Sequence, residues 1–197
     1  MEAGDSQSDR VRIQRFVPDE PFPPYSYVTG MFPHPTRDSA GHSFGAVPAP
    51  CSMPDPNLWR ECRPYLYGLD LFNHGYYWEA HEAWEGLWHA CGRAGPAGNF
   101  IQGLIKLAAA GVKAREGRPE GVRTHARRAA ELFGQVAGRL PPGRVCYFGL
   151  SLPRLITLAT DVARGLVVSS ARTGAPVEVV FQFILRPDES QWSESEA

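Results

Sequence analysis

The segment Phe72-Asn-His-Gly-Tyr-Tyr-Trp-Glu-Ala-His-Glu-Ala-Trp-Glu-Gly-Leu-Trp88 combines bulky aromatic groups with histidines and carboxylates. From Tyr76 on, only Gly86 opposes a helix, so we predict one helix over residues 76–90. At 100° per residue, one narrow core-facing sector of this helix collects aromatic and polar side chains. Its members are Tyr77, His81, Trp84 and Trp88, with Glu85 at the edge.

The polar residues of this helix point in different directions. The same spacing places Glu79 and Gly86 on the far side of the helix, with Glu82 between the two sides. A histidine, His81, and a carboxylate, Glu85, therefore lie at or beside the aromatic side. Buried polar groups need partners, so the function depends on what satisfies these two side chains.

Composition narrows the class of protein. A net charge of −1 over 197 residues provides no general attraction to nucleic acid or to an anionic membrane, so we expect neither partner. The four cysteines are widely spaced and form no CxxC pair, which argues against a disulfide framework or a zinc knuckle. No export signal and no run of 18 apolar residues is visible. We therefore expect a soluble, cytoplasmic protein.

The chain divides into four parts by composition. Residues 1–55 are rich in proline and predict an extended or partly disordered arm, and residues 56–165 predict a helical domain. Residues 166–186 predict a turn and a short strand, and residues 187–197 a disordered acidic tail. The arm is unusually aromatic between residues 22 and 45. We expect that part to lie across the folded domain and to bring a histidine to a site.

Caps and periodicity predict the other elements, with a loop over residues 91–99. The predicted helices are a short one over 55–62 and longer ones over 65–73, 100–115, 119–138 and 151–165. The 100–115 helix is apolar nearly all round, which is typical of a central helix, and its polar stripe is Gln102, Lys106 and Lys113. Val177–Leu185 alternates like a strand, which would need the arm or another subunit as a partner.

Two segments, around Gly75 and around Gly117, share a helix–glycine turn–helix pattern. They are similar to tetratricopeptide-like hairpins but are too few for an open array, so a closed bundle fits better. The predicted fold is all-α. We expect a compact bundle of about five helices built on two antiparallel hairpins, with an extended N-terminal arm and one short C-terminal strand.

The central segment resembles the bacterial and archaeal family called domain of unknown function 309. The resemblance rests on the motif Phe72-x-x-Gly75-x-Tyr77-x-Glu79-Ala80-His81-Glu82-x-Trp84-Glu85-x-x-Trp88, followed by Gln102-Gly103-Leu104-Ile105. It covers roughly residues 60–140. It implies a small all-helical fold and no established activity. It also implies a histidine near the end of the second motif's helix, where this chain has Lys113.

Metal binding is the first chemistry that these residues suggest. The segment His81-Glu82-Ala-Trp-Glu85 has the outline of the zincin HExxH helix, with a glutamate in place of the second histidine. His81 and Glu85 share a helix face and can reach one ion, while Glu82 would act as a base beside His81. A third ligand would have to come from another segment. The candidates are His34, His42 and His74.

Two other interpretations remain open. In one, His81 and Glu82 carry out acid–base chemistry without a metal, in an aromatic pocket that suits a planar ligand. That pocket would be lined by Tyr77, Trp84, Trp88, Gln102 and Lys106. In the other, the motif is structural, His81 bonds Glu85 or a carbonyl, and the acids hold Lys106, Arg93 or Arg115.

We therefore predict a small-ligand or metal-binding helical domain centred on His81, Glu82 and Glu85, with a divalent metal as the candidate cofactor. The expected partner is a small molecule or a second copy of the chain. The alternative is an interaction module that presents a tetratricopeptide-like helical face, with a purely structural motif. Whether the protein is an enzyme stays open, because no residue specifies a substrate.

Overall fold

The computed structural model describes residues 13–47, 50–168 and 174–188. Within these residues a 3-10 turn, η1 (Trp59–Glu61), precedes the first helix, and a short hairpin joins β1 (Cys146–Tyr147) to β2 (Leu150–Ser151). The five helices are α1 (Arg63–Asn73), α2 (Tyr77–Ala90), α3 (Gly95–Arg115), α4 (Pro119–Ala137) and α5 (Leu152–Arg164). The sequence places nearly all of this regular structure between the proline-rich arm and the C-terminal segment.

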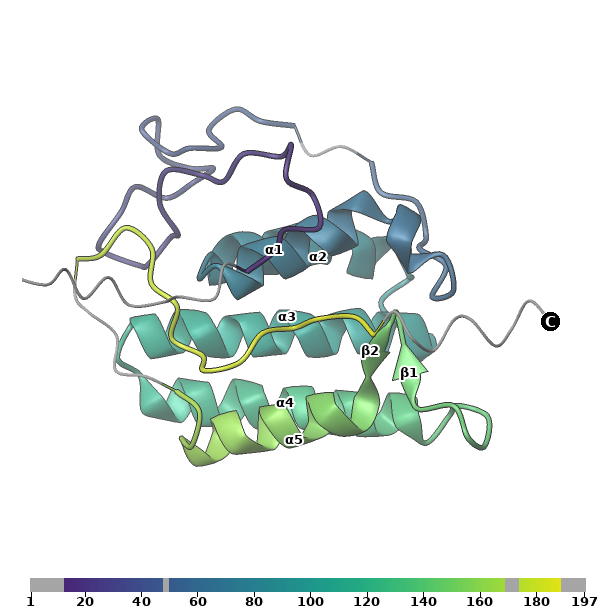
Figure 1. Cartoon of the computed structure of the whole chain (residues 1–197). Coiled ribbons are helices and arrows are strands. Elements are labelled where there is room, and N and C mark those ends of the chain that lie inside the picture. Colours follow the sequence, from purple (N-terminus) through teal and green to yellow (C-terminus); the bar gives the residue numbers. More distant parts are fainter. Residues whose placement is uncertain (1–12, 48–49, 169–173, 189–197) are drawn as a thin grey trace, which may run out of the picture.

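Consecutive helices pack against one another, and α3 lies between α2 and α4 (Figure 1). The arm runs above α1 and α2, and the C-terminal segment crosses in front of α3 toward the hairpin (Figure 1). The predicted all-α bundle of about five helices is therefore confirmed. No helix in the described parts of the chain is both long and apolar enough to cross a membrane.

The centre of the bundle is α3, as its apolar circumference predicts. Two of its glycines let the neighbouring helices approach closely. A Cβ at Gly111 would lie 2.5 Å from the ring of Tyr77 in α2, and one at Gly103 would lie 2.5 Å from the ring of Phe133 in α4. A larger residue at either position would force the helices apart, which explains the glycine in the Gln-Gly-Leu-Ile segment.

Local signals predict most helix ends correctly. Proline occupies the first turn of α1, α4 and α5, where its missing N–H costs nothing. Ser151 caps α5 by accepting a bond from the Arg154 amide, and Gly165 ends that helix with a left-handed φ of 76°. These ends need no tertiary contact to form.

The start of α3 differs from the prediction. The helix begins at Gly95 and not after Asn99, because Pro96 lies in its first turn, where proline favours a helix. Asn99 is therefore inside the helix, and its side chain donates to Gln135 Oε1 at 3.1 Å. The short helix predicted over 55–62 is reduced to the 3-10 turn η1.

The position of the strands also differs from the prediction. Val177–Leu185 forms no strand, and its one ladder contact is an isolated bridge between Val168 and Phe181. The strands lie instead in the β1–β2 hairpin, whose turn residues Phe148 and Gly149 both have positive φ. Such a turn is typical of two-residue hairpins, but Phe-Gly lacks the usual Asn-Gly signal.

The C-terminal segment finds its partners in the arm and in the helices. The Ser26 amide donates to Pro176 O at 2.9 Å, so the arm does lie beside this segment, as expected. The hydroxyl of Tyr77 accepts bonds from the amides of Val180 at 3.0 Å and Phe181 at 3.3 Å. Helix side chains thus take the place of a neighbouring strand.

Candidate functional site

The first half of the motif holds the chain's own C-terminal segment. Asn73 donates from Nδ2 to Leu185 O at 2.9 Å and accepts at Oδ1 from the Leu185 amide at 2.7 Å. Tyr77 receives two amides of the same segment, as described above, and burial raises the pKa of its hydroxyl to about 12. Gly75 has φ +88°, and a Cβ there would lie 2.6 Å from Glu178 O. These motif residues have structural partners.

The helical wheel places Glu79 on the far side of α2 from the aromatic residues, and the structure buries Glu79 there. It is 6% exposed, because the arm covers this side of the helix. Its Oε1 accepts a bond from the Tyr27 amide at 2.9 Å and lies 3.2 Å from His42 Nε2. Glu79 therefore lies away from the aromatic side of α2, and the arm gives the helix a second covered face there.

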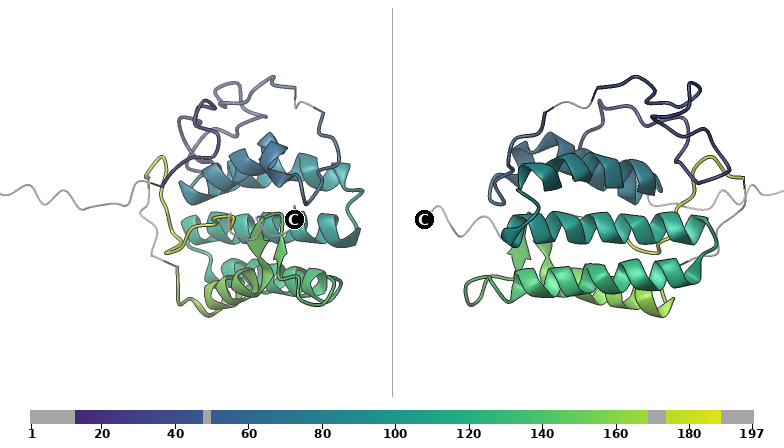
Figure 2. Two further views of the ribbon diagram at one scale, coloured as in Figure 1. Left: turned by 45° about the vertical axis from the view of Figure 1, so that its right-hand side comes forward. Right: turned by 180° about the vertical axis from the view of Figure 1, so that it is seen from behind.

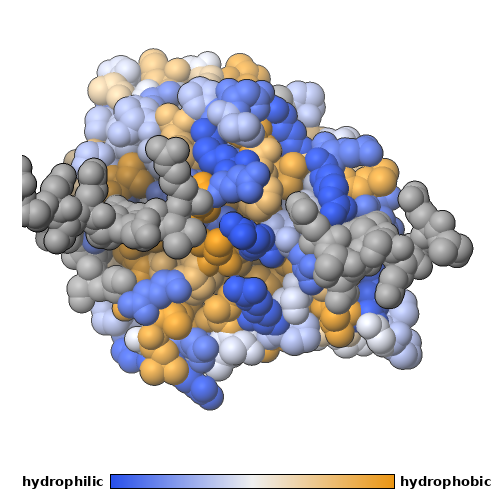
Figure 3. All heavy atoms as spheres, in the orientation of Figure 1, coloured by the Kyte–Doolittle hydropathy of each residue, from blue (hydrophilic) through white to orange (hydrophobic). Residues whose placement is uncertain are grey.

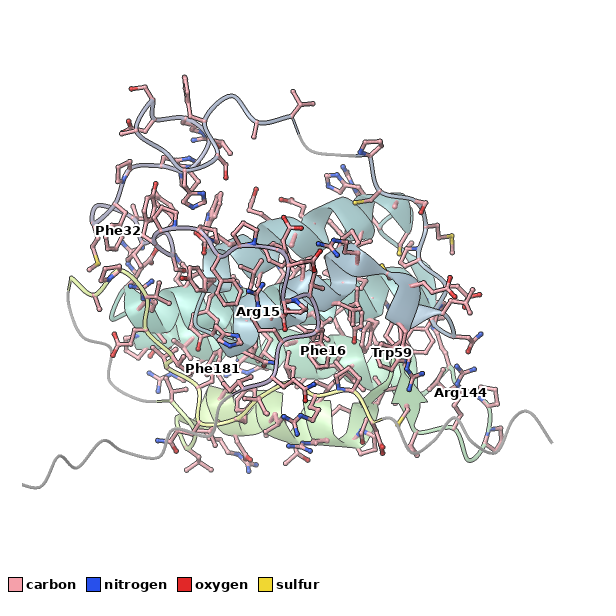
Figure 4. All side chains as sticks on the ribbon, turned by 45° about the horizontal axis from the view of Figure 1, so that its top comes forward. Arg15, Phe16, Phe32, Trp59, Arg144 and Phe181 are labelled. Atoms are coloured by element: carbon pink, nitrogen blue, oxygen red, sulfur yellow. The ribbon has the colours of Figure 1, made fainter. Side chains whose placement is uncertain are left out.

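Two further buried ionic groups anchor the arm, and no local sequence signal predicts either role. Asp70 accepts bonds from the amides of Phe16 and Val17, both at 2.8 Å. Arg115 donates to Ser26 O at 3.0 Å and to Ala175 O at 2.5 Å. Burial lowers the pKa of Arg115. The start of the arm, with Arg15 and Phe16, can be followed against the helices in Figure 4.

The three histidines proposed as a third metal ligand lie elsewhere. His34 packs its ring against Tyr27 and Trp78, with ring centroids 5.0 Å and 5.8 Å away. His42 contacts Glu79, and His74 Nδ1 lies 2.7 Å from the carbonyl of Asp70. Among the described residues, the group that could hold a metal ion contains none of them. The arm does contribute histidines, but to the opposite side of α2.

That group consists of His81, Glu82 and Glu85, from the second half of the motif. One ligand atom from each residue lies within 4.8 Å of the others. His81 Nδ1 is 3.3 Å from Glu82 Oε1, and the two side chains are 30% and 42% exposed. Within the described parts of the chain, Nδ1 is buried and has no hydrogen bond. The cluster is therefore reachable from solvent and contains an unsatisfied donor nitrogen.

The aromatic residues of the predicted pocket separate into core and surface. Tyr77 and Trp84 are fully buried, and Trp84 Nε1 donates to Tyr65 O at 3.2 Å. Trp88 is half-buried, with the Arg93 guanidinium 5.5 Å from its ring centroid. Because Tyr77 and Trp84 face the core, they hold α2 rigidly and do not present an open surface to a planar ligand.

A polar stripe runs along α3, which lies between α2 and α4 in the view from behind (Figure 2, right). Gln102, Lys106 and Lys113 of α3 are half-buried there. Lys113 pairs with Glu116 at 2.7 Å. The three residues form the polar stripe that the sequence predicts for the central helix.

His125 of α4 belongs to this face and was missed by sequence reasoning. Burial lowers its pKa first, and the charges of Lys106, Lys113 and His81 lower it further. Helix pairing would have revealed it: a Cβ at Gly121 would meet the Lys113 side chain at 2.8 Å, and His125 follows one turn later. Three helices thus bring two histidines, two carboxylates and two lysines to one face.

Comparison with known families agrees with the motif. Residues 65–125 match the model of the family described as Domain of unknown function (DUF309), so this segment is similar to that family. The resemblance predicted from the sequence is confirmed over that segment, which includes the His81 cluster and ends at His125. Among curated proteins no match to the chain was found.

Proposed function

We propose that the protein binds a divalent transition metal through His81, Glu82 and Glu85 on α2. The observation that carries the proposal is the convergence of one imidazole and two carboxylates within 4.8 Å, with His81 Nδ1 buried and lacking a hydrogen bond among the described residues. A buried nitrogen without a hydrogen bond is costly, and a bound cation would satisfy it.

The donor set suits a borderline metal. Imidazole and carboxylate ligands are those that zinc, manganese and ferrous iron accept, and zinc has the higher affinity of these by the general stability order. Three protein ligands leave coordination positions for water or a substrate. Glu82, expected from the sequence as a general base, is assigned here to the ligand set because its carboxylate lies next to His81.

The structural interpretation predicts ion pairs that the described residues do not make. Arg93 contacts His89 Nε2 at 3.3 Å, and Arg115 is committed to backbone carbonyls of the arm and the C-terminal segment. No ion pair joins either arginine, or Lys106, to Glu82 or Glu85 in the described parts of the chain. Within the described residues, both carboxylates are therefore without a lysine or arginine partner, and Glu82 has His81 as its neighbour.

Zinc titration followed by calorimetry, with elemental analysis of the metal-loaded protein, tests the proposal. We expect one equivalent of zinc to bind the full chain, and affinity to fall about 10-fold or more in His81→Ala and in Glu85→Gln. Cobalt substitution provides a spectroscopic readout, since ligand-field bands of Co²⁺ should appear in the wild type and be lost in both variants.

His89→Ala is the matched control, because His89 is an exposed histidine of the same helix outside the cluster. It should bind zinc like the wild type. Equal zinc affinity in His81→Ala and wild type, with both folded by circular dichroism, would overturn the proposal.

An interaction module is the second candidate. Tetratricopeptide-like hairpins bind peptides along a helical face, but here the chain's own arm and C-terminal segment lie along α1, α2 and α3 (Figure 1). The helical face that a partner would use is therefore already covered, so we favour the metal site over the interaction module. The four cysteines form no disulfide within the described residues, which supports a reducing compartment such as the cytoplasm.

A further inference from the structure

A cavity of about 520 Å³ lies between the arm, α5 and the C-terminal segment. Its walls come from three segments that are distant in the sequence. Phe16 comes from the arm, Leu155 and Leu158 from α5, and Ile184 and Leu185 from the C-terminal segment. The volume falls within the range of small-molecule pockets, about 300–1,000 Å³.

The floor of this cavity is apolar, and hydrogen bonds to neighbouring residues hold its backbone in place. Leu155 is 2% exposed and Leu185 is 1% exposed, and both belong to the hydrophobic core. The two bonds from Asn73 hold Leu185 in place, and those from Asp70 hold Phe16. On the face seen in Figure 3, hydrophobic atoms reach the surface next to strongly hydrophilic side chains.

The rim of the cavity is basic. Arg15, Arg154 and Arg186 line it together with one acid, Asp188. Arg15 is committed, because its Nε lies 3.6 Å from buried Asp70 and its Nη2 donates to Val17 O at 2.8 Å. The side chains of Arg154 and Arg186 are exposed and form neither an ion pair nor a hydrogen bond within the described ranges. Two guanidinium groups are thus left at the mouth of a cavity that has both apolar and polar walls.

We propose that this cavity binds an amphipathic carboxylate, with its aliphatic or aromatic body on the Leu155–Leu158 floor and its anionic group on Arg154 and Arg186. Guanidinium and carboxylate form paired, charge-assisted hydrogen bonds, and the apolar body is transferred out of water. None of the residues involved belongs to the proposed metal site. The two proposals can therefore be tested independently.

Calorimetric titration of the full chain with decanoate tests this inference, with decanol as the uncharged probe of the same chain length. We expect decanoate to bind with one site and decanol to bind at least about 10-fold more weakly. The double variant Arg154→Gln, Arg186→Gln should lose about 10-fold in affinity for decanoate and retain its affinity for decanol.

Two further variants separate the cavity from general surface charge. Arg127→Gln removes an exposed arginine of α4 that lies outside the cavity and should bind decanoate like the wild type. Leu158→Trp, at a half-buried wall position, should fill the cavity and weaken both probes.

Three results would overturn the inference. The first is the absence of decanoate binding to the wild type, as expected if another part of the chain or a second copy fills the cavity. The second is equal affinity for decanoate and decanol, which would leave the arginines without a role. The third is an equal loss in Arg127→Gln and in the double variant, which would indicate nonspecific attraction.

Discussion

His42 Nε2 lies 3.2 Å from Glu79 Oε1, and these two side chains, from the arm and from α2, are only 6% and 5% exposed. Glu79 also accepts the Tyr27 amide, so one carboxylate of the motif holds the arm at two points. The motif therefore combines two tasks on one helix. Glu79 binds the arm on one side, and the His81 cluster remains reachable from solvent on another.

Replacing Glu79 by alanine should release the arm. The change leaves the Tyr27 amide and His42 without their acceptor. Each unsatisfied buried group costs about 1–3 kcal/mol, so we expect a loss of about 2–6 kcal/mol in the free energy of unfolding. Urea unfolding measures it. Glu82→Ala, at an exposed position of the same helix, should change stability by about 0.5 kcal/mol or less. Equal losses in both variants would contradict the anchoring role.

The C-terminal segment should loosen when Asn73 is replaced. Asn73 is only 3% exposed, and Asn73→Ala removes its two hydrogen bonds to the backbone of Leu185. The free energy of unfolding should therefore fall by about 1–3 kcal/mol. Hydrogen exchange of the Leu185 amide should become faster. Gln182→Ala, at an exposed position of the same segment, should leave that exchange rate unchanged. Unchanged exchange in Asn73→Ala would show that other contacts hold the segment.

Gly75 and Gly117 provide a matched pair of left-handed glycines. Both have positive φ, +88° and +67°, so alanine at either one costs about 1–2 kcal/mol in backbone strain. Only at Gly75 would the added Cβ also meet a backbone oxygen, Glu178 O at 2.6 Å, whereas at Gly117 nothing lies within 4 Å. Gly75→Ala should therefore be the more destabilising in thermal unfolding. Equal losses of stability in the two variants would show that the contact with Glu178 O does not contribute.

The lowered pKa of His125 predicts a dependence of stability on pH. Below its ordinary value of 6.5 the unfolded chain binds a proton more readily than the folded chain, so stability decreases as the pH falls through that region. We expect His125→Gln to lose less stability than the wild type between about pH 7.5 and about pH 5.5, measured by urea unfolding.

A second variant tests the cause of that pKa. Lys106→Met keeps His125 but removes one of the cations that lower its pKa, so the loss of stability on acidification should become smaller. Identical pH profiles in wild type, His125→Gln and Lys106→Met would show that other groups determine the acid sensitivity.

The helices could be predicted because their signals are local. Proline in the first turn of α4, Ser151 before α5 and Gly165 after it act within a few residues, and the apolar circumference of α3 identifies it as central. His81 and Glu85 of the candidate cluster could also be singled out, since residues four apart on a helix share a face. For these features the chain's own backbone geometry is sufficient.

Only the tertiary structure decided which polar side chains have partners within the fold. A helical wheel assumes one covered face, but the arm covers a second face of α2, so Glu79 is buried and His42 is directed to it. The pattern of Val177–Leu185 indicated a strand, yet Asn73 and Tyr77 satisfy its backbone in place of a ladder. His125 joined the candidate face only through the pairing of α3 with α4. Such contacts join residues far apart in sequence, and no local period encodes them.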